Sequence, residues 1–182
     1  MWPMTVTLSD SIPNDVTFER AIALTQSLMS YMEQGNISDD EISATIQKLA
    51  STLPGARGFF VSYLTDDRPF ADRPSEATLA GLASSADIVA DLLVKNLAMS
   101  SAMVLTHRRR DDETMAKQSE RVRNRSGQLI KSLNLPQVAE KLPQLLATAQ
   151  TGEGTYQSFM QRWNYDEEQR EAIAIAIAIA SL

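Results

Sequence analysis

The sequence predicts an all-α fold, a compact bundle of about seven or eight helices. Apolar residues recur three and four positions apart through most of the chain, which is the spacing of a buried helix face. Helix start and stop signals separate these stretches, with capping residues such as Ser38 and Asp166 at their starts and Gly35 and Pro54 at their ends. Few segments of the chain have the pattern of a strand. A single strand has no neighbour to pair with, so the sequence does not predict a sheet.

Length and composition are those of one globular domain. Of the 182 residues, 43% are hydrophobic and 22% are charged, which is enough apolar material for a sizeable core. We expect a flexible N-terminal arm over residues 1–14, with a short strand over residues 5–8 as the alternative, and a single helical domain over residues 15–182. The chain has no cysteine, which excludes disulfides, thiolate nucleophiles and cysteine metal sites.

Residues 15–53 are predicted to form a helical hairpin. The first helix starts near Asp15 and ends at Gly35, since glycine readily takes the left-handed conformation after a last turn. The second helix starts in a capping box over residues 38–41 and stops at Pro54-Gly55.

The stretch 58–65 fits either a buried strand or a short buried helix. Its aromatic and β-branched residues between turn signals favour a strand, whereas the lack of a partner strand favours the helix, which we expect. The extended alternative covers residues 59–64. The following residues 66–74 contain Asp-Arg-Pro twice and are predicted to be a surface loop, because proline disrupts a helix interior.

Further helices are predicted in the second half of the chain. They cover residues 75–83, 87–106, 111–133, 136–151, 155–163 and 166 to the C-terminal residues. The helix over 87–106 is strongly apolar and is expected to be central. Pro143 is expected to kink or split its helix, because proline removes a backbone donor and its ring clashes with the preceding turn.

Residues 172–180 alternate alanine and isoleucine without a break, a period of two that is typical of a strand. The preceding Asp-Glu-Glu-Gln-Arg-Glu is a strong helix start and alanine is the best helix former, so we expect a helix. A helix spreads the four isoleucines around its circumference, so we expect the core or another chain to enclose it. The candidate apolar partner-binding residues are Ile173, Ile175, Ile177 and Ile179.

A basic stretch interrupts an otherwise acidic chain. Residues 107–125 carry 7 Lys and Arg against 4 Asp and Glu, whereas the rest carries 10 against 19, for a net charge of −6 overall. Such asymmetry indicates a surface that meets an anionic partner, although a solvated face neutralised by neighbouring glutamates gives the same pattern. The candidate basic partner-binding surface comprises Arg108, Arg109, Arg110, Lys117, Arg121 and Arg125, of which the last three form one helical stripe.

Most catalytic templates do not fit this chain, and we predict no catalytic, cofactor-binding or metal-binding residues. His107 is the only histidine, and the chain has no Gly-x-Ser-x-Gly elbow, His-x-x-x-His pair, EF-hand loop or phosphate-binding glycine loop. His107 falls at the end of the helix over 87–106, where the helix dipole favours a cation, so a capping role is preferred. The acidic pairs fall at helix starts or in a turn, where capping accounts for them.

Two segments resemble a known family. They are residues 53–67 (Leu-Pro-Gly-Ala-Arg-Gly-Phe-Phe-Val-Ser-Tyr-Leu-Thr-Asp-Asp) and residues 96–107 (Asn-Leu-Ala-Met-Ser-Ser-Ala-Met-Val-Leu-Thr-His). Together they are similar to an uncharacterised family of small cytoplasmic proteins from cyanobacteria, over residues 16–180. The resemblance rests on no mechanistic motif and carries over no catalytic or binding residues. It implies a photosynthetic bacterial context, in which accessory factors of photosynthetic or carbon-fixing complexes become candidate roles.

The leading hypothesis is a non-enzymatic helical interaction, assembly or regulatory factor that binds a protein partner or associates with itself. One alternative is a nucleic-acid-binding module that uses the helix over 111–133; the acidic charge of the whole chain and the lack of interleaved aromatic residues weigh against it. A second alternative is an enzyme acting on a small anionic metabolite, with His107 or Tyr63 as acid–base group.

We expect a cytoplasmic protein without a membrane span. The longest wholly apolar run is nine residues, Ala172–Ala180, against the about 20 that a span requires. The N-terminal residues lack the basic and apolar regions of a signal peptide.

Overall fold

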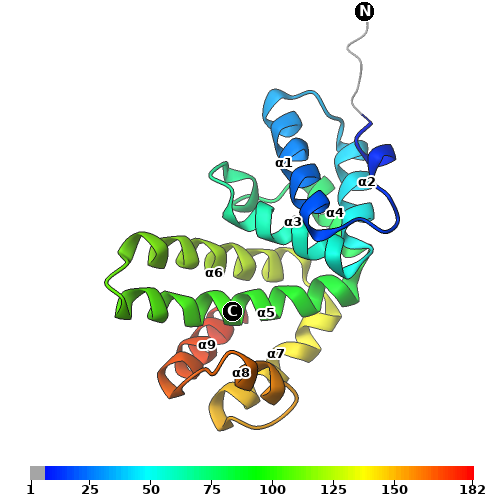
Figure 1. Ribbon diagram of the computed structural model, residues 1–182. Helices are drawn as coiled ribbons and strands as arrows, with labels where there is room; N and C mark the ends of the chain where they lie inside the picture. The colour runs from blue at the N-terminus through cyan, green and yellow to red at the C-terminus, as the bar shows by residue number, and fades with distance from the viewer. Residues whose placement is uncertain (1–6) are drawn as a thin grey trace, which may run out of the picture. The chain divides into compact units, whose positions relative to one another are not determined.

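The computed structural model describes residues 7–182 and is all-α there, as the sequence predicts (Figure 1). The α-helices in this part are α1 Phe18–Gln34, α2 Asp39–Ala50, α3 Leu53–Thr65, α4 Glu76–Ala83, α5 Ala86–Arg109, α6 Glu113–Leu133, α7 Pro136–Thr151, α8 Gln157–Arg162 and α9 Glu167–Ala180, with 3-10 helices η1 Ser9–Ser11 and η2 Pro69–Ala71. Residues 59–64 lie inside α3, so the helical prediction is confirmed and the extended alternative is wrong. The Ala/Ile stretch is also helical, in α9.

By its internal contacts the chain divides into two compact units, Met1–Val89 and Ala90–Leu182. The sequence led us to expect one domain over residues 15–182. The boundary falls inside α5, which runs without a break from Ala86 to Arg109. No change of composition marks such a boundary, because the residues on both sides belong to one apolar helix.

In the first unit, α1 packs chiefly against α3, and α2 packs against α4 and α3. Two glycines permit this close approach. A Cβ placed on Gly58 would lie 2.5 Å from the Cβ of Ala21 and 2.7 Å from the carbonyl oxygen of Phe18. A Cβ placed on Gly81 would lie 2.8 Å from the Cβ of Ile46. The predicted hairpin of α1 and α2 is thus held mainly through α3 and α4.

Capping residues explain where these helices begin and end. Thr17 caps α1, two residues after the predicted start, and Gly35 ends it in the left-handed conformation with φ 68°, as predicted. Thr52 caps α3, so Pro54 lies in the first turn, where the missing N–H needs no partner. Pro54 therefore opens α3, whereas the sequence indicated only a stop for α2.

Within the predicted N-terminal arm, the short helix η1 packs on α2. The apolar side chains of Leu8 and Ile12 on either side of it are buried. The backbone N–H of Ser9 donates a 2.6 Å hydrogen bond to the carboxylate of Glu41. Residues 1–6 of the predicted arm, and with them half of the alternative strand over 5–8, lie outside the described residues.

In the second unit, α9 packs against α7 and α6. α5 and α6 run as an antiparallel pair joined by a tight turn, in which Asp111 takes the left-handed conformation with φ 55° (Figure 1). α7 continues through Pro143 without a break, so the predicted split is wrong. Burial of Leu142 and Leu145 on either side offsets the about 3 kcal/mol that an interior proline costs.

By length and composition alone, α5 is long and apolar enough to cross a membrane. Over its best 18-residue window the mean hydropathy is 1.6, and 56% of that window is buried inside the structure. Within residues 7–182 it is the one such helix. Such burial is equally typical of the central helix of a folded core, the role that its apolar residues predict.

Candidate functional site

α9 carries its isoleucines as two pairs on opposite faces. Ile173 and Ile177 are 0% and 1% exposed, whereas Ile175 and Ile179 are 56% and 57% exposed. Residues four apart share a helix face, and residues two apart point in nearly opposite directions. Within this chain the core encloses one pair, and the other pair stands in solvent, where only another chain could cover it.

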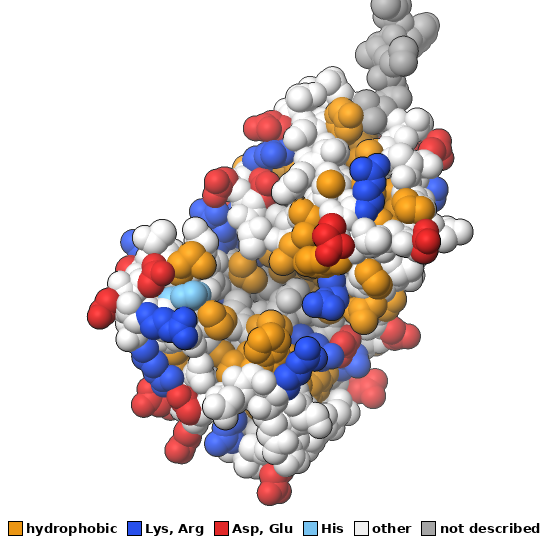
Figure 2. All heavy atoms as spheres, viewed as in Figure 1, with side chains coloured by type: hydrophobic (Ala, Val, Ile, Leu, Met, Phe, Trp, Pro, Cys, Tyr) orange, Lys and Arg blue, Asp and Glu red, His pale blue; other side chains and the backbone are white. Residues whose placement is uncertain are grey.

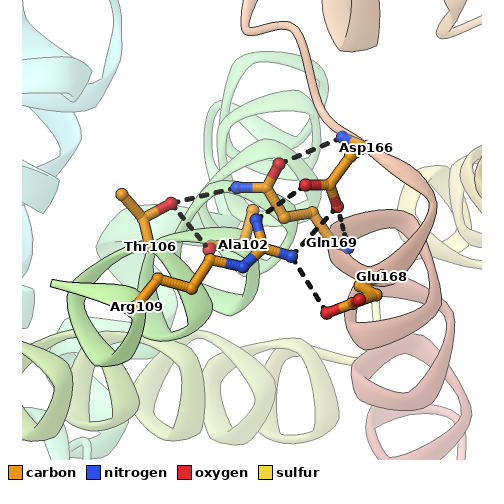
Figure 3. A network of polar contacts seen from close by, with 6 residues as sticks. All are labelled: Ala102, Thr106, Arg109, Asp166, Glu168 and Gln169. Atoms are coloured by element: carbon orange, nitrogen blue, oxygen red, sulfur yellow. Dashed lines mark hydrogen bonds and ion pairs between the residues drawn. The ribbon is translucent and has the colours of Figure 1, made fainter. Parts of the chain in front are cut away.

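The start of α9 is fixed by a network of polar contacts with the end of α5 (Figure 3). Asp166 and Gln169 form a reciprocal capping box, in which each side chain accepts a hydrogen bond from the other's backbone N–H. The side-chain nitrogen of Gln169 donates to the hydroxyl of Thr106 at 2.9 Å. Arg109 donates to Asp166 at 2.6 Å and to Glu168 at 3.0 Å. These contacts determine which face of α9 points outward.

The outward face of α9 is apolar over its second half. We call it the exposed α9 face, and it comprises Ile175, Ala178, Ile179 and Leu182. Ile175, Ala178 and Ile179 follow helical spacing and form one continuous strip on α9, and Leu182 lies two residues beyond the end of the helix. A soluble surface commonly scatters such side chains singly, whereas an apolar strip along one helix is typical of a contact surface.

Two hollows flank the end of α9. The first has a volume of about 240 Å³, lies between α9 and α6, and is lined by Leu97, Arg123, Asn124, Gly127, Gln128, Lys131, Ala176, Ile179 and Ala180. The second has a volume of about 590 Å³, lies between α9 and α7, and is lined by Ile130, Lys131, Asn134, Leu135, Val138, Ala139, Leu142, Pro143, Ala180, Ser181 and Leu182. Lys131 and Ala180 line both, so the hollows meet at the end of α9.

The charge around these hollows has one sign. Arg123 and Lys131 are the charged residues among the lining side chains, and no aspartate or glutamate lines either hollow. Lys131 is exposed, and Arg123 is half-buried and donates to the side chain of Asn124 at 3.2 Å. An apolar strip bordered by cations is suited to an apolar partner that also carries acidic residues.

The structure disperses the predicted basic surface. Arg108 forms ion pairs with Glu113 and Glu120, and Arg109 is bound to α9 as described above. Arg125 is only 3% exposed and Arg121 is half-buried, so neither belongs to an open cationic stripe. Two of the six predicted residues remain exposed without an ion pair in the described part of the chain, Arg110 and Lys117. Acidic and basic side chains are interspersed on the visible face in Figure 2.

Tyr63 and His107, the groups considered for acid–base chemistry, lie in α3 and α5. The hydroxyl of Tyr63 is buried and donates to the carbonyl oxygen of Phe70 at 2.8 Å. His107 lies in the last turn of α5, where its carbonyl accepts from the backbone N–H of Asp112. Burial raises the pKa of Tyr156 and of Tyr165 to about 12, so both phenols stay protonated at neutral pH. Among residues 7–182, no group of three or more acidic or histidine side chains is placed to hold a metal ion.

A family model described as uncharacterised conserved protein UCP020893 matches residues 17–180. The chain belongs to this family. The match runs from the N-cap of α1 to the last residue of α9, so it covers the helices of both units and the exposed α9 face except Leu182. No curated protein and no solved structure matches the chain.

Sequence reasoning missed Arg123 and Lys131, although the sequence holds a signal for them. Asn124, Gln128 and Lys131 follow helical spacing and give α6 a polar strip without acids. The orientation of α9 had a signal as well: Glu171 precedes Ile175 by four residues, which places a charged residue on the same face. That pairing indicates that Ile175, and not Ile173, points into solvent.

Proposed function

We propose that this protein is a non-enzymatic interaction or assembly factor that binds a protein partner with the exposed α9 face. The observation that carries the proposal is the exposure of Ile175 and Ile179 beside the Lys131-lined hollows. Covering a fully exposed isoleucine yields about 1.5–3 kcal/mol, so two half-exposed ones and Leu182 supply a useful share of a binding free energy. Aligned along one helix, they favour a helix or groove as the docking element.

The proposal extends to where the factor acts. The resemblance to cyanobacterial proteins supports a cytoplasmic role in a photosynthetic bacterium, with a photosynthetic or carbon-fixing complex as the setting. Within such a setting the partner is a protein with an apolar surface and carboxylates that meet the hollows beside α9, because Arg123 and Lys131 are the charged side chains that line them.

The nucleic-acid alternative has less support from the geometry. A helix that reads a groove or follows a phosphate backbone presents several free cations on one side. α6 instead has Arg125 buried and Glu120 paired with Arg108, and the chain carries a net charge of −6. The enzyme alternative likewise has little support, since the hydroxyl of Tyr63 is buried and donates to the carbonyl oxygen of Phe70.

The test is co-purification of the tagged protein from its own cells, with proteins identified by mass spectrometry. We expect a bound protein that is retained by the wild type and lost from Ile175→Asp. Arg110→Glu is the matched control, because Arg110 is exposed and borders neither hollow. Loss from Arg110→Glu alone would move the site to the α5–α6 turn, and unchanged binding in Ile175→Asp at native helical content would refute the proposal.

A further inference from the structure

We infer that the occupant of the exposed α9 face is a second copy of this chain, docked with the two α9 helices antiparallel. This inference rests on the protein-binding function proposed above and names the partner. An interface with two-fold symmetry places the same surface on both sides, so that surface has to complement itself. The apolar residues of α9 meet this requirement, and so do the charged residues Glu171 of α9 and Lys131 of α6.

The apolar residues are in register for an antiparallel pair. Ile175 and Ile179 are four residues apart, about 6 Å along the helix. With the two-fold axis midway between them, Ile175 of one copy lies opposite Ile179 of the other, and the reverse pair forms by symmetry. Ala178 is then close to the axis, where its small side chain lets two helices approach to about 8–10 Å.

The charges are in register for the same arrangement. Glu171 stands one turn before Ile175 on the outward face, about 9 Å from the axis, and forms no ion pair with a described residue. Lys131 stands at the other end of the strip, beside Ala180. Antiparallel docking places Glu171 of one copy next to Lys131 of the second, and symmetry forms this pair twice.

Charge also selects antiparallel over parallel docking. In a parallel pair, Glu171 would face its own copy and Lys131 would face its own copy, and like charges across an interface are unfavourable. A strip of two or three helical turns covers less than the about 800 Å² per partner of a standard interface. We therefore expect a reversible dimer whose population rises with protein concentration.

The experiment is sedimentation velocity of the purified full chain over a range of concentrations. We expect a monomer–dimer equilibrium for the wild type and monomer alone for the double variant Ile175→Asp/Ile179→Asp. Lys131→Glu and Glu171→Lys should each raise the dissociation constant about tenfold. The double variant Lys131→Glu/Glu171→Lys should restore it towards the wild-type value, because the two pairs re-form with reversed charge.

Controls separate this result from loss of folding or of overall charge. Lys117→Glu and Glu153→Lys make the same charge changes at exposed positions away from the hollows and should leave the dissociation constant unchanged. Helical content by circular dichroism confirms that each variant is folded. A wild type that stays monomeric, a dimer that survives Ile175→Asp/Ile179→Asp, or a charge swap without rescue would overturn the inference. A monomeric wild type that still binds another protein through Ile175 would overturn the inference alone and leave the proposed function standing.

Discussion

The side-chain nitrogen of Gln169 donates a 2.9 Å hydrogen bond to the hydroxyl oxygen of Thr106 and so joins the start of α9 to the last turns of α5. The carbonyl oxygen of the same side chain accepts from the backbone N–H of Asp166, at 3.0 Å. Gln169 is buried, and both ends of its amide have partners. One side chain thus caps α9 and holds it in the orientation that exposes Ile175.

Gln169→Ala should lower the free energy of unfolding by about 1–3 kcal/mol. The substitution removes half of the capping box and leaves Thr106 without a donor. The measurement is urea unfolding followed by circular dichroism. Gln161→Ala, at an exposed position of α8, should change the stability by less than about 0.5 kcal/mol. Equal effects of the two substitutions would show that the Thr106 contact contributes nothing.

The contribution of Asp166 to stability should depend on pH. The hydrogen bond from Arg109 is the largest cause that holds the pKa of Asp166 below its usual value, and the backbone N–H of Gln169 adds to it. The folded state therefore favours the charged carboxylate. The resulting stability is complete above the unfolded pKa of about 3.9 and is lost as the pH falls through the lower folded pKa.

Asp166→Asn tests this dependence, because asparagine still caps a helix but carries no charge. The wild type should have the higher urea midpoint at pH 5–7, and the difference should shrink as the pH is lowered below about 4. Asp39→Asn is the control, since Asp39 lies in the first turn of another helix without an ion pair in the described chain. A difference that stays constant down to about pH 2 would contradict the role of the Arg109 pair.

Local signals predicted the helices well, because caps and stops act within a few residues. Gly35, Ser75 and the Asp166 capping box lie where the sequence placed them. The helix boundaries near Pro54 and Pro143 were harder to predict. Proline fits the first turn of a helix, and it also fits a helix interior that packing stabilises. The sequence pattern alone does not distinguish these cases.

The candidate site was predicted in part, and the misses have a physical cause. The sequence singled out α9, but its two isoleucine pairs are chemically identical, and packing decides which pair is buried. The basic stripe was predicted from helical spacing, which carries no information about the elements that pack against it. Arg125 is buried, and Arg109 is exposed but paired with Asp166, 57 positions away, so tertiary contacts bury one cation and neutralise the other.

Gly58→Ala should destabilise the protein by more than about 2 kcal/mol. The new methyl group would clash with Ala21 and with the backbone of Phe18, and α1 cannot move away without losing its packing on α3. Gly127→Ala is the matched change in α6, where the nearest atom to a new Cβ is 3.9 Å away. It should stabilise the protein by about 0.4–1 kcal/mol, because alanine favours the helix. Thermal unfolding of both variants would show shifts of opposite sign, and a Gly58→Ala variant as stable as the wild type would contradict the close approach at Gly58.

Substitutions in the two isoleucine pairs of α9 should change the free energy of unfolding by different amounts. Ile177→Ala removes a fully buried side chain and should cost about 2–5 kcal/mol. Ile175→Ala alters an exposed position and should change the free energy of unfolding by less than about 0.5 kcal/mol. Urea unfolding at low protein concentration keeps self-association out of the comparison.

Truncation of the chain before Ile175 also tests the difference between the buried and the exposed residues of α9, with a larger expected effect. The deleted residues include Ile177, Ala176 and Ala180, which are buried, so the shortened chain should lose helical content and cooperative unfolding. The substitutions Ile175→Asp and Ile179→Asp together should leave both intact, because only exposed side chains change. A truncated chain that unfolds like the wild type would show that the second half of α9 is dispensable for the core. In that case Ile177, as well as Ile175 and Ile179, would be free to serve a partner.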